Sequence, residues 1–534
     1  MSKHPPQQID AIVVGAGFAG MYMLHKLRGQ GLSVRVIEAG DGVGGTWFWN
    51  RYPGARVDIH SMEYAFSFDP ALEREWRWSE RYAPQAELLA YANHVADRYD
   101  LRRDIQFSTR VASAHFDESA ARWEVAADTG ESWSARWCIM ATGCLSTPKD
   151  LDFAGMEDFT GTIYKTFAWP HEGVDFTGQR VAVIGTGSSA IQSIPVIAAQ
   201  AVQLTVYQRT PNYSVPAWNG PISAETQADW DANRATYRAT ARQQGIAANV
   251  DAGEALALET PLAEVTAEFE RRWAIGGFTV ATGFADTGID LAANKIAADF
   301  VGGKIRGIVS DAATAEKLVP KSYPFATKRL CVDTGYYATF NRPNVALVDL
   351  TQTPITALTP AGIATTAGET PFDAIVFATG FDAMTGTLSR IDIRGRGGVP
   401  LAEKWAHGPL TYLGLMVAGF PNLFLITGPG SPSVLTNMIM SIEQHVEFIA
   451  DAIAWLGERQ HTTIEASAEA EAGWVAHVAE IADTTLYPLA NSWYMGANVP
   501  GKPRVFLPYV GGFPAYVEAC EDVVARDYAG FVAG

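Results

Sequence analysis

The chain has 534 residues, 48% of them hydrophobic, so at about 150 residues per domain it can form three or four units with buried cores. Its net charge of −18 leaves no basic surface for a phosphate backbone, which argues against nucleic acid as a partner. No apolar run could span a bilayer and no apolar signal core opens the chain, so a cytoplasmic protein without membrane contact is expected.

The four cysteines are scattered along the chain and form no Cys-x-x-Cys pair. Such spacing predicts neither a zinc site nor a dithiol relay nor a secreted disulfide framework. We therefore expect no metal centre and four reduced thiols, at Cys138, Cys144, Cys331 and Cys520.

A strand, a glycine turn and a helix follow one another at the start of the chain. The apolar strand 11–14 leads into the turn Gly15-Ala-Gly17-Phe-Ala19-Gly20, and a second strand, 34–37, ends at Glu38. Glu38 lies 18 residues beyond the last glycine (38 − 20), close to the roughly 20 expected of an acid that binds a ribose. Glycines allow the backbone to approach a pyrophosphate, and the helix N-terminus supplies N–H donors. This order predicts a site for FAD.

The following segments predict a mixed α/β unit with a covering loop. Residues 44–58 are rich in aromatics, glycine and proline, which is typical of a loop over a ligand. Residues 87–99 have a helical pattern, whereas 122–127 and 137–141 have strand patterns. The tripeptide Ala141-Thr-Gly143 recurs as Ala378-Thr-Gly380 after an apolar run at 374–377, which indicates two related nucleotide-binding units.

The second unit begins after an aromatic linker, Phe159 to Pro170. Residues 180–184 form an apolar strand, and the turn Gly185-Thr-Gly-Ser-Ser-Ala190 again precedes a helical pattern. The next strand, 204–208, ends in Arg209-Thr210, 22 residues past Gly187 (209 − 187). Because an acid would repel a 2′-phosphate and arginine can bind it, this unit predicts an NADPH site; the alternative is an exposed arginine that binds nothing.

Beyond Trp218 the pattern changes to helices, with helical spacing at 262–273 and 291–300. Lys328 and Arg329 then lie in a proline-bounded loop and predict either an anion site or a solvated charge pair.

Residues 421–426 and 443–456 predict a strand and a helix that complete the first unit. The expected fold is α/β, with two Rossmann-like dinucleotide-binding domains and a helical insertion. The expected segments are 1–147 and 382–534 for FAD, 148–217 and 327–381 for NADPH, and 218–326 for the insertion.

Oxygen is the expected electron acceptor, since the chain has neither a dithiol pair nor a metal motif. A reduced flavin reacts with O2 to give a C4a-peroxide, which the protein must shield from water and stabilise with cationic groups.

The chain resembles the type I Baeyer-Villiger monooxygenases, most closely the phenylacetone monooxygenase branch, over nearly its full length. The resemblance is carried by several stretches: Gly45-Thr-Trp47 with Tyr52-Pro-Gly54 and Asp58, the linker 159–170, Gly185 to Ala190, Lys328-Arg329, 428–433, and 492–502. It implies that NADPH reduces FAD and that the flavin peroxide attacks a ketone, giving a tetrahedral intermediate and then an ester or lactone.

The resemblance also implies roles for individual residues. Arg329 would stabilise the peroxide and the intermediate, and Asp58 would pair with Arg329. FAD would contact Gly15, Gly17, Ala19, Gly20, Glu38, Thr46, Trp47, Asp58, Ile59, Tyr64, Val111 and Met438. NADPH would contact Thr186, Gly187, Ser188, Ser189, Ala190, Ile191, Gln192, Arg209, Thr210, Lys328, Arg329 and Trp493. The ketone would contact Val434 and Leu435.

One position departs from the family pattern, in which the linker reads Phe-x-Gly-x-x-x-His-x-x-x-Trp. Lys165 replaces the histidine, and lysine cannot act as a neutral ring acceptor. We expect altered coupling between the domains rather than lost chemistry. Two alternatives stay open: an N- or S-oxygenating enzyme or uncoupled NADPH oxidase, and a non-catalytic flavoprotein that senses NADP(H).

Overall fold

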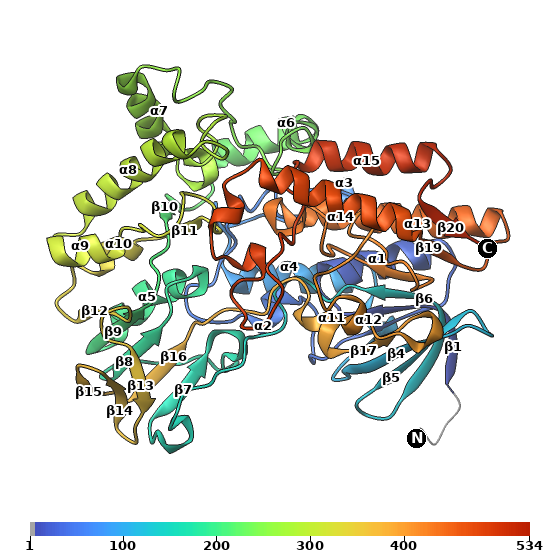
Figure 1. Ribbon diagram of the computed structural model, residues 1–534, viewed down its shortest axis with the longest axis horizontal. Coiled ribbons are helices and arrows are strands. Elements are labelled where there is room, and N and C mark those ends of the chain that lie inside the picture. Colours follow the sequence, from blue (N-terminus) through green and yellow to red (C-terminus); the bar gives the residue numbers. More distant parts are fainter. Residues whose placement is uncertain (1–5) are drawn as a thin grey trace.

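The structure, a computed structural model, describes residues 6–534 and has two sheets side by side with helices around them (Figure 1). The first sheet has eight strands in the order β17-β4-β5-β6-β1-β2-β3, with β18 paired to β6. Strands β1, β2, β3, β6 and β18 pair in parallel, and β4 to β6 form an antiparallel meander. The strands are β1 (Gln7–Val14), β2 (Val34–Ile37), β3 (Ile105–Gln106), β4 (Val111–Asp117), β5 (Arg122–Ala127), β6 (Ser132–Met140), β17 (Asp392–Arg394) and β18 (Leu423–Leu425).

The second sheet has five parallel strands in the order β12-β9-β8-β16-β7. They are β7 (Thr162–Lys165), β8 (Arg180–Ile184), β9 (Gln203–Gln208), β12 (Val345–Asp349) and β16 (Ala374–Phe377). Three small sheets complete the strands: β10 (Ser214–Pro216) with β11 (Cys331–Asp333), β13 (Ile355–Leu358) with β14 (Gly362–Thr365) and β15 (Gly368–Pro371), and β19 (Ile464–Ala466) with β20 (Phe531–Ala533).

Helices and strands are interspersed along the chain, and α1 packs against α13 beside the first sheet (Figure 1). They are α1 (Phe18–Gly29), α2 (Thr46–Trp49), α3 (Pro70–Glu75), α4 (Gln85–Arg98), α5 (Ser188–Gln200), α6 (Ala224–Arg242), α7 (Leu262–Ile275), α8 (Leu291–Ile308), α9 (Ala312–Leu318), α10 (Tyr336–Thr339), α11 (Gly386–Arg390), α12 (Leu401–Lys404), α13 (Met438–Glu458), α14 (Ala468–Asp483) and α15 (Phe513–Ala525).

Strand β1 is buried on both faces, which explains its uninterrupted apolar sequence. Val13 packs into one core with Leu24 of α1, whereas Ile12 packs into a second core with Trp123 and Trp133 on the other face. Alternate residues of a strand point to opposite faces, so a strand covered on both sides needs apolar residues throughout. This central strand fixes where the first glycine turn begins.

The expected fold class is confirmed, and the predicted strands and helices are present, although α8 continues eight residues beyond its expected end at 300, and β6 and α13 each begin five residues before their expected starts at 137 and 443. The aromatic linker differs from expectation, because its residues Thr162–Lys165 form β7, the edge strand of the second sheet. Lys165 pairs in register with Phe377 of β16. A four-residue strand within a loop-like sequence gives little periodic signal.

Two chain segments cross between the sheets side by side. The N–H groups of Met384 and Asp382 donate to the carbonyls of Cys144 (2.7 Å) and Thr147 (2.9 Å), and that of Lys149 donates to Gly380 (3.3 Å). Residues 144–149 and 380–384 therefore run antiparallel, and we call them the paired crossovers. They tie the ends of β6 and β16 together.

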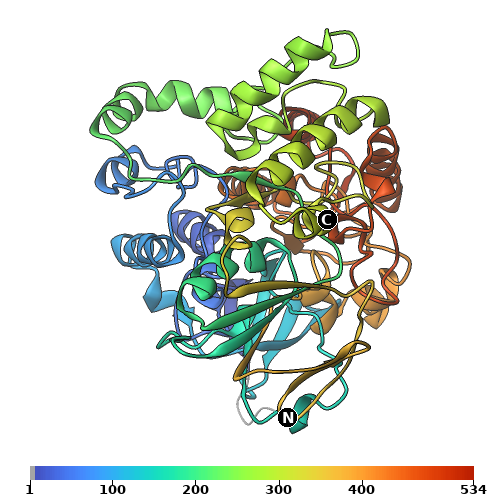
Figure 2. The same cartoon turned by 90° about the vertical axis from the view of Figure 1, so that its left-hand side faces the viewer.

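The helices α6, α7 and α8 form a layer beyond the second sheet, which Figure 2 shows in green at the top of the molecule. Arg238 of α6 ties this layer to the first half of the chain, because its guanidinium donates to Glu73 (2.7 Å) and to the carbonyls of Glu63 (3.0 Å) and Ala65 (3.0 Å). The helical layer thus supports the loop around Glu63 and Ala65 that precedes α3.

Candidate functional site

A cavity of about 1530 Å³ runs along the carboxyl ends of both sheets. Its wall includes the residues that follow β1, β2, β6, β8, β9 and β16, namely Gly15, Glu38, Ala141, Gly185, Arg209 and Ala378. Open α/β sheets bind ligands at this edge, where turns between strands and helices leave a crevice. The cavity is therefore the candidate active site.

The first glycine turn is held in a form that only glycine allows. A Cβ on Gly15 would lie 2.6 Å from the Ala141 carbonyl oxygen, and Gly15 has a φ of +106°. A Cβ on Gly20 would lie 1.8 Å from the Gly15 carbonyl oxygen. The turn therefore packs against the end of β6 while Gly15 and Gly17 face the cavity; Gly20 serves helix packing and does not line it.

Glu38 lies at the end of β2 and is only 5% exposed. Its carboxylate accepts hydrogen bonds from the backbone N–H groups of Ala16 and Gly40, each at 2.7 Å. Burial raises the pKa of Glu38, and these hydrogen bonds oppose the rise. The carboxylate thus shapes the glycine turn and also lines the cavity.

The residues expected around a flavin converge on this end of the cavity. Trp47 and Tyr64 pack edge to face, with their ring centroids 5.9 Å apart. All of the other expected flavin contacts that follow Glu38 line the same wall, namely Thr46, Asp58, Ile59, Val111 and Met438, as does Ala19.

The second glycine turn repeats the geometry of the first. Gly185 has a φ of +115°, and a Cβ there would lie 2.4 Å from the Ala378 carbonyl oxygen. A Cβ on Gly187 would meet no atom within 4 Å, so this glycine leaves open space in the cavity wall. Thr186, Ser188, Ser189 and Gln192 line the cavity as well.

Two residues expected at the coenzyme lie elsewhere. Ala190 and Ile191 are almost fully buried and pack in the hydrophobic core with Val181 and Val183 of β8. As the third and fourth residues of α5, they lie on the helix face turned to the sheet. Leu435 likewise packs beside the cavity without lining it, whereas Val434 lines it.

A group of cations lies at the end of the cavity near β9. Arg209, Thr210 and Lys328 line this end, and the Lys328 ammonium lies 4.5 Å from the centre of the Tyr323 ring. Burial, with Arg209 as a second cause, lowers the pKa of Lys328 to about 8. Lys149, which the sequence pattern did not single out, lines the same cavity.

Arg329 and Asp58 form a two-pronged ion pair in the cavity wall. The Nε and Nη2 atoms of Arg329 donate to the Asp58 carboxylate, each at 2.9 Å, and Nη1 donates to the Val434 carbonyl at 2.8 Å. The Phe278 ring centre lies 4.6 Å from the guanidinium carbon. All three contacts fix the orientation of the cation.

Electrostatics keep Arg329 charged. Burial lowers its pKa, but Asp58 and the Tyr494 hydroxyl outweigh this effect, so the pKa of Arg329 is raised overall. Tyr494, which is 2% exposed, and Phe278 were missed in the sequence. Tyr494 follows the expected contact Trp493, but nothing local indicates that its hydroxyl reaches Arg329.

The C-terminal segment 491–498 closes part of the cavity and is tied to one paired crossover. Asn498 Nδ2 donates to the Phe381 carbonyl at 2.8 Å, and Lys502 Nζ lies 2.6 Å from the Asp382 carboxylate. Trp493 lines the cavity. These contacts hold the C-terminal segment against the crossover 380–384.

The wall fits two dinucleotides. Five buried polar side-chain atoms of residues that line the cavity have no hydrogen-bond partner among residues 6–534: Trp47 Nε1, Arg56 Nε, Thr379 Oγ1, Ser492 Oγ and Asn498 Oδ1. Buried polar atoms are normally satisfied, so such atoms at a cavity indicate ligand contacts. Together with the open space at Gly187 and the cations at Arg209, they suit a polar, anionic ligand beside the second turn.

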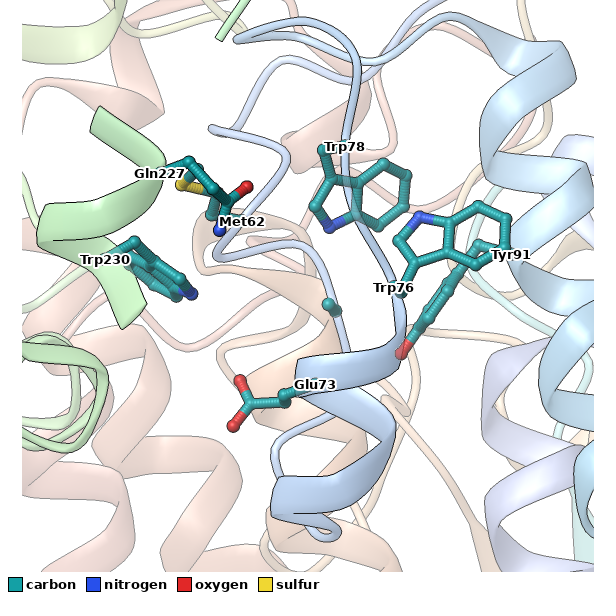
Figure 3. A pocket seen from close by; sticks show the side chains of 8 residues that line it. Met62, Glu73, Trp76, Trp78, Tyr91, Gln227 and Trp230 are labelled. Carbon is teal, nitrogen blue, oxygen red and sulfur yellow. The ribbon is translucent and has the colours of Figure 1, made fainter. Parts of the chain in front are cut away.

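A small cavity lined by Trp76, Trp78, Tyr91 and Trp230 lies between α3 and α6 (Figure 3). Its volume is about 10 Å³, which is room for about one water molecule and no substrate.

In the part of the chain from residue 6 onwards, no group of three or more His, Cys, Asp or Glu side chains is arranged to hold a metal ion. The helices of that same part include none long and apolar enough to cross a membrane.

Comparison with known proteins gives a family match over about half of the chain and relatives that match nearly all of it. A family model described as pyridine nucleotide-disulphide oxidoreductase matches residues 12–298. The chain is 43% identical over 528 residues to a Baeyer-Villiger monooxygenase of Pseudooceanicola batsensis, covering 98% of this chain and 96% of that protein. It is 42% identical over 536 residues to a phenazine N-monooxygenase of Lysobacter antibioticus, covering 100% and 98%.

Solved structures agree with the whole architecture. A steroid monooxygenase in its oxidised form, bound to NADP, matches with a TM-score of 0.95 at 51% identity, covering 99% of both chains. A crystal structure of OTEMO in complex with FAD and NADP matches with a TM-score of 0.96 at 39% identity, covering 99% of this chain and 100% of that one.

Proposed function

This chain belongs to the Baeyer-Villiger monooxygenase family, and we propose that it uses NADPH and O2 to oxidise a ketone to an ester or lactone. The observation that carries the proposal is the Arg329–Asp58 pair in a cavity that both glycine turns border. FAD, when bound, supplies the redox chemistry that takes electrons from NADPH and activates oxygen.

Arg329 provides the fixed positive charge that this chemistry requires. Oxygen transfer to a carbonyl develops negative charge on oxygen, and a preorganised cation stabilises it without rearranging during the reaction. Asp58 accepts two hydrogen bonds and holds the guanidinium plane, while the Val434 carbonyl fixes the third nitrogen. Asp58 therefore positions Arg329.

The two cofactors divide the cavity. FAD lies at the first glycine turn, where it contacts Glu38 and the other expected flavin residues that line the cavity. NADPH lies at the second glycine turn. Arg209 and Lys328 bind the 2′-phosphate, because charge-assisted hydrogen bonds to phosphate are the strong ones. Val434 bounds the ketone site, and Leu435, which does not line the cavity, packs beside it. The FAD-binding segments are 1–147 and 382–534, and the NADPH-binding segments are 148–217 and 327–381, with 218–326 inserted.

The test is a panel of phenylacetone-like, long-chain, cyclic and steroid ketones. Purified protein loaded with FAD is given NADPH and air, NADPH consumption is followed by absorbance, and products are identified by mass. We expect at least one ketone to yield a product heavier by one oxygen atom, with hydrogen peroxide a minor product. NADPH consumption that yields only hydrogen peroxide with every ketone contradicts the proposal.

N-oxygenation is a second candidate, favoured by the full-length match to a phenazine N-monooxygenase. The same assay with phenazine in place of the ketone distinguishes the two. An N-oxide without any ester from the ketone panel supports this second function. Ester formation without an N-oxide supports the first.

A further inference from the structure

Lys149 lies on the first of the paired crossovers and lines the end of the cavity near Arg209. Its backbone N–H donates to the Gly380 carbonyl at 3.3 Å, and the adjoining pair Pro148 and Phe381 forms an antiparallel bridge. The space next to Gly380 is filled by the lysine stem, since a Cβ there would lie 4.0 Å from Lys149 Cε. The crossover therefore fixes the backbone from which the lysine reaches the cavity wall.

The order of the second sheet sets Lys149 opposite Arg209. Strand β8, which ends in the second glycine turn, lies between β9 and β16. Arg209 follows β9, and Gly380, which holds Lys149, follows β16. Two strand spacings amount to about 10 Å. Arg209 and Lys149 thus flank the glycine turn from opposite sides, and their long side chains can span the distance of about 10 Å between the ends of β9 and β16.

The described residues supply no ion-pair partner for these cations. Among residues 6–534 no carboxylate lies within ion-pair distance of Lys149, Arg209 or Lys328. The neighbouring Asp150 pairs with Arg390 at 3.2 Å. Burial, and Arg209 as a second cause, lower the pKa values of both lysines. In a chain with a net charge of −18, three unpaired cations around one end of a cavity indicate an anionic ligand of high charge density.

We propose that Lys149 is a third cationic contact for the 2′-phosphate of NADPH and determines coenzyme specificity with Arg209 and Lys328. The inference rests on the proposed function, which assigns NADPH to the second glycine turn. It adds a residue from the opposite side of that turn, on a segment that reaches the phosphate only because the two crossovers pair.

The variants that test it are Lys149→Gln, which removes the charge at similar length, and Lys149→Arg, which keeps it. Lys295→Gln is the matched control, because Lys295 lies on α8, is 71% exposed and pairs with Asp299. Each FAD-loaded protein is titrated calorimetrically with NADP+, NAD+, adenosine 2′,5′-bisphosphate and ADP. Flavin absorbance checks that each variant is folded.

Lys149→Gln should weaken the binding of NADP+ and of adenosine 2′,5′-bisphosphate by about tenfold or more, as expected for the loss of one charged hydrogen bond. NAD+ and ADP should change by less than about twofold, on the same reasoning, and the salt dependence of NADP+ binding should decrease. Lys149→Arg should retain most of the affinity, and Lys295→Gln all of it.

Two results overturn the proposal. If Lys149→Gln binds NADP+ as tightly as the unchanged protein, Lys149 does not contact the 2′-phosphate. If the affinities for NADP+ and NAD+ fall equally, the lysine contacts the pyrophosphate instead. Arg209→Gln, measured in the same way, shows whether only the role of Lys149 is wrong or the proposed function as well. If Arg209→Gln also leaves the discrimination between NADP+ and NAD+ intact, the assignment of the coenzyme site itself is wrong.

Discussion

The two glycine turns have the same backbone framework but opposite charges beside them. In each, the first glycine has a φ above +100° and packs against the carbonyl of the alanine in an Ala-Thr-Gly tripeptide, at Ala141 or at Ala378. In the first unit the next strand ends in buried Glu38, which accepts hydrogen bonds from its own turn. In the second, the corresponding strand ends in Arg209. One scaffold thus suits two nucleotides, and we propose that the residue after the second strand selects between them.

Arg329, which lies where the two units meet, should give the largest effect. Arg329→Ala should lower ester formation by about 10²–10³-fold or more, because a preorganised cation is lost. Reduction of the flavin by NADPH should remain measurable in a stopped-flow experiment without oxygen. Retained ester formation would remove Arg329 from the catalytic role.

Arg209 tests the charge difference between the units directly. Arg209→Ala should raise the KM for NADPH by the equivalent of about 1.5–3 kcal/mol, the value of a charged hydrogen bond. The KM for NADH should change far less, since NADH carries no 2′-phosphate. Equal effects on both coenzymes would show that Arg209 does not bind this phosphate.

The pH dependence of coenzyme binding sharpens the same comparison. Because burial lowers the pKa of Lys328 to about 8, its positive charge is present below that pH and is lost as the pH rises through it. NADP+ affinity should therefore fall above about pH 8 more steeply than NAD+ affinity. Calorimetry between pH 7 and pH 9 measures this, with Lys328→Arg as the variant that should flatten the profile.

Lys165 should give the smallest effect. It lies at the end of β7, pairs with Phe377 and is outside the cavity wall. Lys165→His should change the ratio of ester formed to NADPH consumed while leaving both activities present. Identical rates and coupling in the two proteins would show that the lysine is neutral.

Much of the site was readable from local sequence patterns. Gly15, Glu38 and Gly185 follow from strand, turn and helix signals within about 30 residues, the span of a single βαβ unit. The family resemblance added Asp58 and Arg329, which the structure joins in one ion pair although they are 271 residues apart. The family resemblance placed Ala190 and Ile191 at the coenzyme, but their positions on α5 turn them to the core.

The sequence by itself determined the two nucleotide units and the charge beside each turn, because short-range geometry requires glycine, acid or arginine at set spacings. Only the tertiary structure decided which distant groups meet. Lys149 reaches the second unit through pairing with Gly380, and Tyr494 and Phe278 approach Arg329 from the C-terminal segment and the helical layer. Such contacts depend on how separate elements pack, and no local periodicity records that packing.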